Sequence, residues 1–167
     1  MPTGLKATSA NVANGFAVTE SGANTFTQGS VDLNLSPLDR EVFVVTSINL
    51  DPTPPENVGA TDTRTSTSLT TTSQTAVAGL DNSNCLAAAV MYIRAHATGQ
   101  VAFVSQAEQP PATLDYLGII ATNDFFLQIE GDGNVGAKAL KGKLYGYRAR
   151  ATADIYSALV QSEVLSA

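Results

Sequence analysis

The sequence predicts an all-β fold, a β-sandwich or barrel of about eight short strands with a short C-terminal helix. Segments of alternating apolar and polar residues recur at intervals of about 10–15 residues. Breaks rich in proline and glycine separate these segments, and a helical pattern is clear only near the end of the chain. With 167 residues, of which 44% are hydrophobic, the chain is long enough to bury a core as one domain.

The strongest strand signal covers residues 40–50, which are rich in β-branched and aromatic side chains. Strict alternation places one set of side chains on a single face: Val42, Val44, Thr46, Ile48 and Leu50. Phe43 and Val45 make the opposite face apolar as well, which indicates a central strand buried on both sides. Two earlier segments, 16–19 and 25–35, also read as strands.

Two segments in the middle of the chain have more than one interpretation. Residues 63–74 are nearly all threonine and serine, which fits a low-complexity linker or, as we prefer, a polar strand at an edge or surface. Residues 85–98 are rich in alanine and precede Gly99, which is typical of a helix. The same residues alternate in polarity and lead into 101–104, which favours a β-hairpin.

The C-terminal half supplies the remaining elements. Residues 114–121, 124–130 and 138–150 read as strands, and Ala153–Leu165 carries the helical pattern. The small, polar residues 1–14 predict a flexible N-terminal arm, and residues 15–167 a single β-sandwich domain.

Composition predicts a weakly charged exterior. Charged residues make up only 14% of the chain, against roughly 25% in ordinary soluble domains. Neutral polar surface suits extensive protein–protein contact, because few charges must be desolvated, although an extracellular β-domain can have the same composition. A net charge of −6 argues against general nucleic-acid binding, and we expect no sequence-specific contact with nucleic acid.

The basic residues are unevenly distributed. Five of the nine lie between positions 138 and 150, with no acidic residue among them: Lys138, Lys141, Lys143, Arg148 and Arg150. Such a run is often a solvated strand face. It is also a candidate inter-subunit patch, which would meet the acidic part of a neighbouring copy in a head-to-tail contact.

Residues suited to catalysis or metal binding are scarce. His96 is the single histidine and Cys85 the single cysteine, so neither an intramolecular disulfide nor a zinc site within one chain can form. The oxygen-bearing residues Glu130, Asp132 and Asn134 resemble the start of a calcium loop, but Lys141 stands where that loop needs a glutamate. A tight turn is the preferred interpretation.

A carboxylate pair is the remaining route to enzyme chemistry, because Asp124, Glu130 and Asp132 are close in sequence. Sugar-cleaving sites usually add aromatic platforms, and the chain has no tryptophan. We therefore expect no enzymatic activity, no cofactor and no small-molecule substrate. The N-terminus lacks the layout of a signal peptide, which predicts synthesis in a host cytoplasm without secretion by that route.

Three segments carry a resemblance to a known family: 40–45 (REVFVV), 117–130 (LGIIATNDFFLQIE) and 147–156 (YRARATADIY). In these segments and in overall plan, the chain resembles the single jelly-roll capsid proteins of tailless icosahedral DNA viruses. The resemblance implies a single jelly-roll β-sandwich of about eight strands that self-assembles with copies of itself, and with other capsid proteins, into a virion. In some such viruses an internal membrane lies beneath the shell. The alternative function is a carbohydrate- or ligand-binding β-sandwich module.

Overall fold

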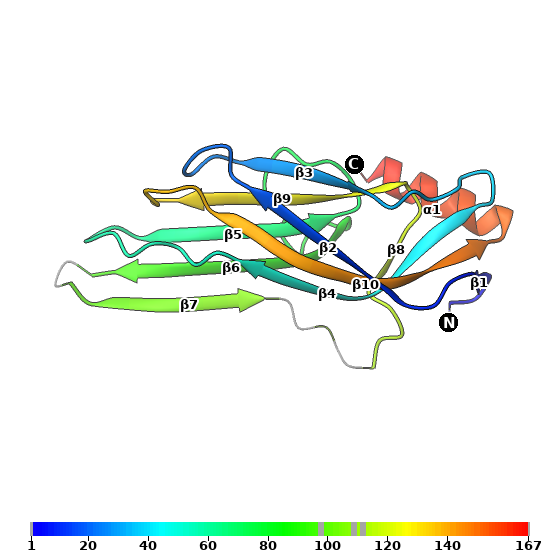
Figure 1. The fold of residues 1–167 in the computed structure, drawn as a ribbon, viewed down its shortest axis with the longest axis horizontal. Helices are drawn as coiled ribbons and strands as arrows, with labels where there is room; N and C mark the ends of the chain where they lie inside the picture. The colour runs from blue at the N-terminus through cyan, green and yellow to red at the C-terminus, as the bar shows by residue number, and fades with distance from the viewer. Residues whose placement is uncertain (1, 97–98, 108–109, 111–112, 167) are drawn as a thin grey trace.

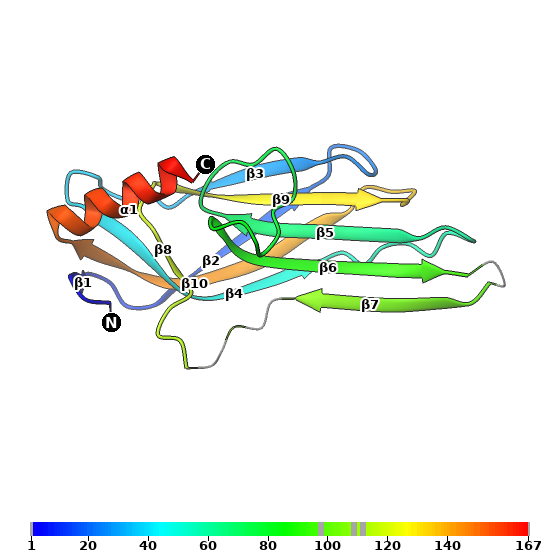
Figure 2. The same cartoon turned by 180° about the vertical axis from the view of Figure 1, so that it is seen from behind.

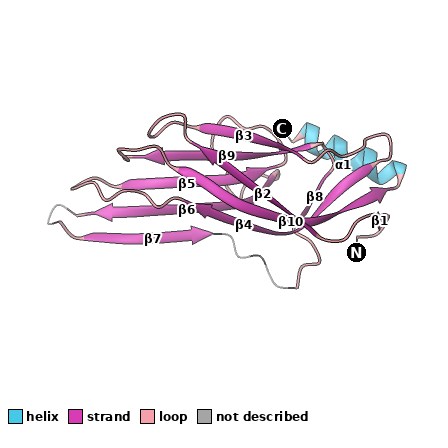
Figure 3. Ribbon diagram, in the orientation of Figure 1, coloured by secondary structure: helices cyan, strands magenta, loops and turns pink. Residues whose placement is uncertain are grey.

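Two antiparallel β-sheets packed face to face form the body of the protein, as Figure 1 shows. The computed structural model describes residues 2–96, 99–107, 110 and 113–166. Strands account for 52% of the chain and helix for 8%, and Figure 3 shows a single helix at one end of the sandwich. The predicted all-β sandwich with a short C-terminal helix is confirmed.

The described residues form ten strands and one helix. They are β1 (Leu5–Ala7), β2 (Val12–Thr19), β3 (Thr27–Asp32), β4 (Glu41–Pro52), β5 (Thr63–Thr70), β6 (Cys85–Ala95), β7 (Val101–Ala107), β8 (Gly118–Ile120), β9 (Asp124–Asp132), β10 (Ala139–Ala151) and α1 (Ala153–Leu165).

Strand order identifies the sandwich as a single jelly roll. In the first sheet β1 and β2 share one side of β10, and the order continues through β4 to β8. The second sheet has the order β3-β9-β5-β6-β7. The pairs β2·β10, β3·β9, β4·β8 and β5·β6 are therefore nested, as in a long hairpin folded over on itself. Two strands exceed the expected eight: β1 continues the edge begun by β2, and β7 extends the second sheet.

The N-terminal segment, predicted to be a flexible arm over residues 1–14, belongs largely to the first sheet. Leu5 pairs with Ala151 and Asn14 with Leu144, on the same side of β10. Between these strands the N–H of Thr8 donates to the carbonyl of Arg148 at 2.8 Å. Because β10 is 13 residues long, it offers a long row of backbone groups, which this segment pairs. Residues 1 and 167, the ends of the predicted arm and domain, lie outside the described residues.

Strand β4 is buried on both faces, as predicted for a central strand. Phe43 and Val45 point between the sheets, where Phe16 and Phe125 meet edge to face with ring centroids 5.8 Å apart. Val42 and Val44 point to the outer face of the first sheet, and α1 covers them there. The helix contributes its apolar stripe to this second cluster: Ile155, Tyr156, Leu159 and Val160.

One detail of the β4 prediction is wrong. Ile48 and Leu50 lie on the face of Phe43 and Val45, not on the face of Val42. A β-bulge causes the switch: Ser47 pairs with Tyr145 and Val45 with Gly146, so Thr46 is an extra residue. Its hydroxyl donates to the carbonyl of Tyr145 at 3.2 Å. After the bulge, each side chain of β4 points to the face opposite the one that strict alternation from Val42 predicts.

The threonine-rich segment is also corrected, because β5 is a central strand between β9 and β6. The loop joining β5 to β6 folds back over the outer face of the second sheet (Figure 2), where the N–H of Ala78 donates to the hydroxyl of Ser68 at 3.0 Å. Ser68 in turn donates to the buried amide of Gln128 at 2.7 Å. Hydrogen bonding of hydroxyls to neighbouring groups allows such polar residues to be buried.

The hairpin interpretation of residues 85–98 is correct for the part that the structure describes. β6 and β7 pair antiparallel from Ala89–Ala107 to Ala95–Val101, and residues 97–98 lie outside the described residues. Within the described residues, no helix combines the length and apolar character that crossing a membrane requires.

Candidate functional site

The residues considered for catalysis are not assembled into a reactive centre. Cys85 begins β6 and His96 follows its end, so they are roughly 35 Å apart along an extended strand. The Cys85 thiol donates to the carbonyl of Ala87 at 3.3 Å. In the part of the chain that the structure describes, no group of three or more histidine, cysteine, aspartate or glutamate side chains is placed to hold a metal ion.

The three acidic residues considered as candidates for a carboxylate pair lie along the outer face of β9, where Asp124 and Glu130 are partly buried and Asp132 is exposed. Its alternate residues Phe125, Leu127 and Ile129 are buried in the core, which turns Asp124, Glu130 and Asp132 to the opposite face. The turn after β9 has Gly133 at φ +68°. The Asn134 amide donates to the carbonyl of Arg64 at 2.8 Å and accepts from the N–H of Glu56 at 3.0 Å, so it has a structural role in this turn.

Buried carboxylates hold loops in place. Glu20 is 4% exposed and accepts the backbone N–H groups of Gly131 at 2.6 Å and Lys138 at 2.7 Å. Glu163, 6% exposed on α1, accepts the N–H of Ala121 at 2.8 Å and both the N–H and hydroxyl of Thr122. Each carboxylate is thus committed to neighbouring hydrogen-bond donors.

Glu56 anchors the loop after β9 in the same way. It accepts the N–H groups of Val135 at 2.6 Å and Gly136 at 3.0 Å, and its second oxygen lies 3.2 Å from Nζ of Lys138. The hydrogen bonds from Gly136 and Val135, followed by the Lys138 ammonium, lower the pKa of this carboxyl. Asp62 similarly has a lowered pKa, first because it accepts the N–H of Ala95 and then because of Arg94.

The five basic residues of the candidate inter-subunit patch have different surroundings. Three form intramolecular ion pairs: Lys138 with Glu56 at 3.2 Å, Arg148 with Glu41 at 3.0 Å and Arg150 with Asp39 at 3.3 Å. Lys138 is only 5% exposed. Arg148 also donates to the carbonyls of Leu33 at 2.6 Å and Asn34 at 3.0 Å, which ties β10 to the segment following β3.

Lys141, Lys143 and Arg150 are the exposed members of that patch, and Arg150 lies beside Asp39. The two lysines are exposed on the outer face of the first sheet, beyond the region that α1 covers. Lys141 stands in register between Ala17 and Asp51, and Lys143 between Gly15 and Asn49. A contact between these lysines and a neighbouring copy remains a prediction.

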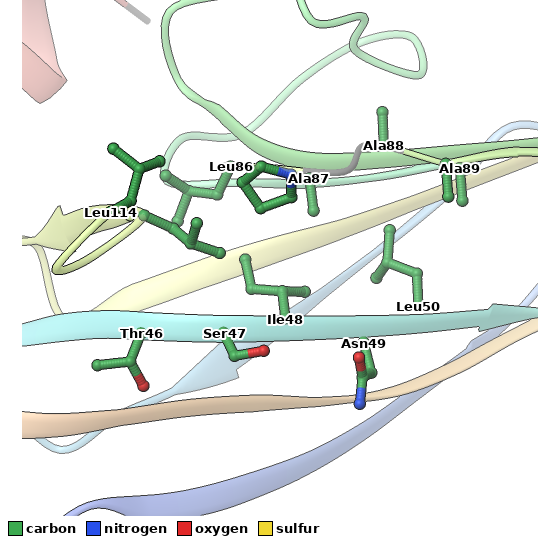
Figure 4. A pocket seen from close by; sticks show the side chains of 13 residues that line it. Thr46, Ser47, Ile48, Asn49, Leu50, Leu86, Ala87, Ala88, Ala89 and Leu114 are labelled. Atoms are coloured by element: carbon green, nitrogen blue, oxygen red, sulfur yellow. The ribbon is translucent and has the colours of Figure 1, made fainter. Parts of the chain in front are cut away.

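A groove of about 420 Å³ lies between the two sheets. The second half of β4 forms one wall, and β6 forms the other. Figure 4 shows Ile48 and Leu50 pointing toward Ala87 and Ala89, while Asn49 points away. The lining residues that the structure describes include no charged and no aromatic side chain: Thr46, Ser47, Ile48, Asn49, Leu50, Leu86, Ala87, Ala88, Ala89, Ala107, Pro110, Leu114 and Leu117.

The groove exists because the two sheets end differently on this side. β8 pairs only with Phe43, Val44 and Val45 of β4, so on the side away from β10 no described strand lies beside the second half of β4. The second sheet instead continues through β6 to β7. In Figure 1 the β6–β7 hairpin extends past β4.

The projecting hairpin exposes apolar side chains on the face that continues the groove. Ile93 pairs with Phe103 and Ala95 with Val101, on the same side of the hairpin as the groove residue Ala89. Phe103 is 56% exposed and Val101 50% exposed. Large apolar residues that are exposed next to one another typically mark an interaction surface, whereas single exposed ones do not.

Comparison with protein-family models, with curated proteins and with solved structures finds no match for this chain. Its function must therefore be argued from the surfaces just described.

The sequence signalled the groove and hairpin only in part. Alternation in residues 85–98 predicted the hairpin, but nothing local shows that β8 is short and leaves β4 uncovered. The composition of residues 101–107 (VAFVSQA) could have indicated a contact surface, because this outermost strand has no charged residue.

Proposed function

We propose that this chain is a structural capsid protein, which self-assembles with copies of itself, and with other capsid proteins, into the shell of an icosahedral virion. The jelly-roll strand order is the first support, because capsid subunits commonly have this architecture. Architecture alone serves many functions, so the surface chemistry must carry the rest of the argument.

The observation that carries the proposal is the uncharged edge of the second sheet. β7 presents seven residues without charge, proline or bulge, and six of the seven are exposed. Proteins that stay apart usually protect such edges with charges or prolines. An edge left open beside exposed apolar side chains is suited to contact with another protein.

The weakly charged exterior supports the same function. Only 14% of residues are charged, and three of the basic side chains near the C-terminus are engaged in intramolecular ion pairs. Large contacts between copies then require few charges to lose water. In this proposal the protein acts in the virion, with no enzymatic step.

A ligand-binding module is the second candidate, and the groove between β4 and β6 is the observation that favours it. Its wall of isoleucine, leucine and alanine side chains suits an apolar ligand. Sugar-binding sites usually offer aromatic side chains for stacking, and the described lining has none, which disfavours the carbohydrate form of the alternative.

Electron microscopy of the purified protein tests the proposal. We expect closed shells or regular sheets of subunits at high protein concentration, under at least one of several salt conditions. Particles that stay monomeric under every condition would contradict a capsid function. A lipid-binding assay with fatty acid examines the second candidate, which predicts saturable binding that an Ala89→Arg substitution in the groove abolishes.

A further inference from the structure

We propose that β7 pairs with β7 of a second copy across a two-fold axis, joining two second sheets into one continuous ten-stranded sheet. The inference rests on the proposed self-assembly and names the contact that begins it. β7 is the last strand of the second sheet, and no other strand of the described chain pairs with its outer side.

Hydrogen bonding within the hairpin fixes which backbone groups of β7 are free. The N–H of His96 donates to the carbonyl of Gln100 at 2.8 Å, so this pair closes the hairpin. Antiparallel pairs alternate between hydrogen-bonded and non-hydrogen-bonded positions along a ladder. The N–H and C=O groups of alternate residues therefore point away from β6: Val101, Phe103, Ser105 and Ala107.

This alternation selects the register between two copies. A two-fold antiparallel contact must set outward-pointing residues opposite one another, so its axis passes through a residue of β7. Only an axis at Val104 pairs all seven residues. Phe103 then stands opposite Ser105 of the second copy, and Val101 opposite Ala107, so every outward-pointing group gains a partner.

The absence of charge in β7 favours a second copy of the chain as the partner of this strand. The residue on a two-fold axis faces its own image, the residues beside it lie close to theirs, and like charges directly opposite destabilise strand pairing. β7 has no charged residue, so self-pairing brings no such repulsion. The exposed Phe103 side chains of the two copies also become diagonal neighbours on one face, and each Val101 packs beside Ala107 of the second copy.

β2 is another uncharged edge, but it is a weaker candidate. Its side chain Val18 already packs toward Gly29 of β3, 3.4 Å from where a Cβ would stand, so this edge folds toward the second sheet. Phe16 is buried in the core, and the exposed positions of β2 are mostly small residues. A head-to-tail contact between β7 and β2 is therefore the alternative outcome of the test.

Disulfide trapping tests the register directly. In a Cys85→Ser background, Val104→Cys should form a disulfide-linked dimer under mild oxidation, because its image lies at a non-hydrogen-bonded position about 4.5 Å away between Cα atoms. Ala102→Cys is the matched control: its image would be roughly 14 Å away, and it should remain monomeric. Cross-linking of Ala102→Cys but not Val104→Cys would overturn the proposed register.

Charge substitution tests the contact itself. Val104→Lys and Val104→Glu should each weaken dimerisation about tenfold, because like charges face each other across the axis. Mixing the two variants should restore it. Ala13→Lys on β2 should change little, and Ala13→Lys dissociating the dimer while Val104→Lys does not would replace the proposal with the head-to-tail contact. Circular dichroism verifies that each variant is folded.

The outcomes separate this inference from the proposed function. If wild-type protein forms no shells but Val104→Cys cross-links as expected, the capsid function fails and the β7 contact stands. If shells form equally well from Val104→Lys, the capsid function stands and the β7 contact is wrong.

Discussion

Individual acidic residues in this protein hold loops in place by accepting their backbone N–H groups. Glu20, Glu56 and Glu163 each accept backbone N–H groups from segments distant in the sequence. A charged acceptor makes a stronger hydrogen bond than a neutral one, so a few such residues position several loops. This role could not be predicted from sequence, because the donors are backbone groups that only the fold brings near.

Removal of the Glu163 carboxylate should detach α1 from the start of β9. Glu163→Ala leaves the N–H groups of Ala121 and Thr122 without their acceptor in a buried setting, which costs about 2–3 kcal/mol in free energy of unfolding. Gln161→Ala, on the exposed side of the same helix, is the control and should stay within about 0.5 kcal/mol. Urea denaturation monitored by circular dichroism measures both, and equal effects would argue against the anchoring role.

Acid should weaken the loop that Glu56 anchors. Its pKa is lower in the folded than in the unfolded chain, so its contribution to stability is present above the unfolded-state pKa. That contribution is lost as the pH falls through the folded-state pKa. Denaturation of wild type and Glu56→Gln across the acid range should therefore give a difference in stability that is largest at neutral pH and shrinks on acidification. A difference independent of pH would contradict this assignment.

Among the elements, β4 and β5 show where local pattern succeeds and where it fails. The apolar residues of β4 on both faces correctly predicted a central strand. Alternation could not reveal the bulge at Thr46, because both faces are apolar before it and Ile48 and Leu50 continue the spacing of Val42 and Val44 after it. For β5 the threonines suggested an edge strand, because buried hydroxyls need hydrogen-bond partners. The fold supplies these partners from β6, β9 and the covering loop, and the local sequence does not show them.

Glycine in β10 permits close approach of neighbouring strands. A Cβ on Gly142 would stand 2.2 Å from the carbonyl oxygen of Asn49 and 2.6 Å from the ring of Phe16. Gly142→Ala should therefore lower the free energy of unfolding by about 1–3 kcal/mol. Gly15→Ala in β2 is the matched control, with nothing within 4 Å, and should be neutral or stabilising by up to about 1 kcal/mol. Thermal unfolding compares them, and equal stability of the two variants would show that the strands can separate at Gly142.

For the whole molecule, composition and the two-residue alternation of apolar and polar side chains predicted the fold class, and the family resemblance supplied the jelly-roll topology. Strand order could not come from alternation, because nested pairs such as β2 with β10 join residues more than a hundred positions apart. The candidate surface was predictable only as a property of the whole exterior, its low charge. The groove and the projecting hairpin depend on how far β8 and β7 extend beside their neighbours, which is decided by tertiary packing.

Sedimentation velocity of the wild-type chain over a series of protein concentrations tests most directly whether its exterior binds copies of itself. The account predicts that sedimentation coefficients rise with concentration, through a dimer to larger assemblies, and that moderate salt preserves the first step because β7 carries no charge. A single species with the mass of one 17.3 kDa chain at every concentration and salt condition would contradict it.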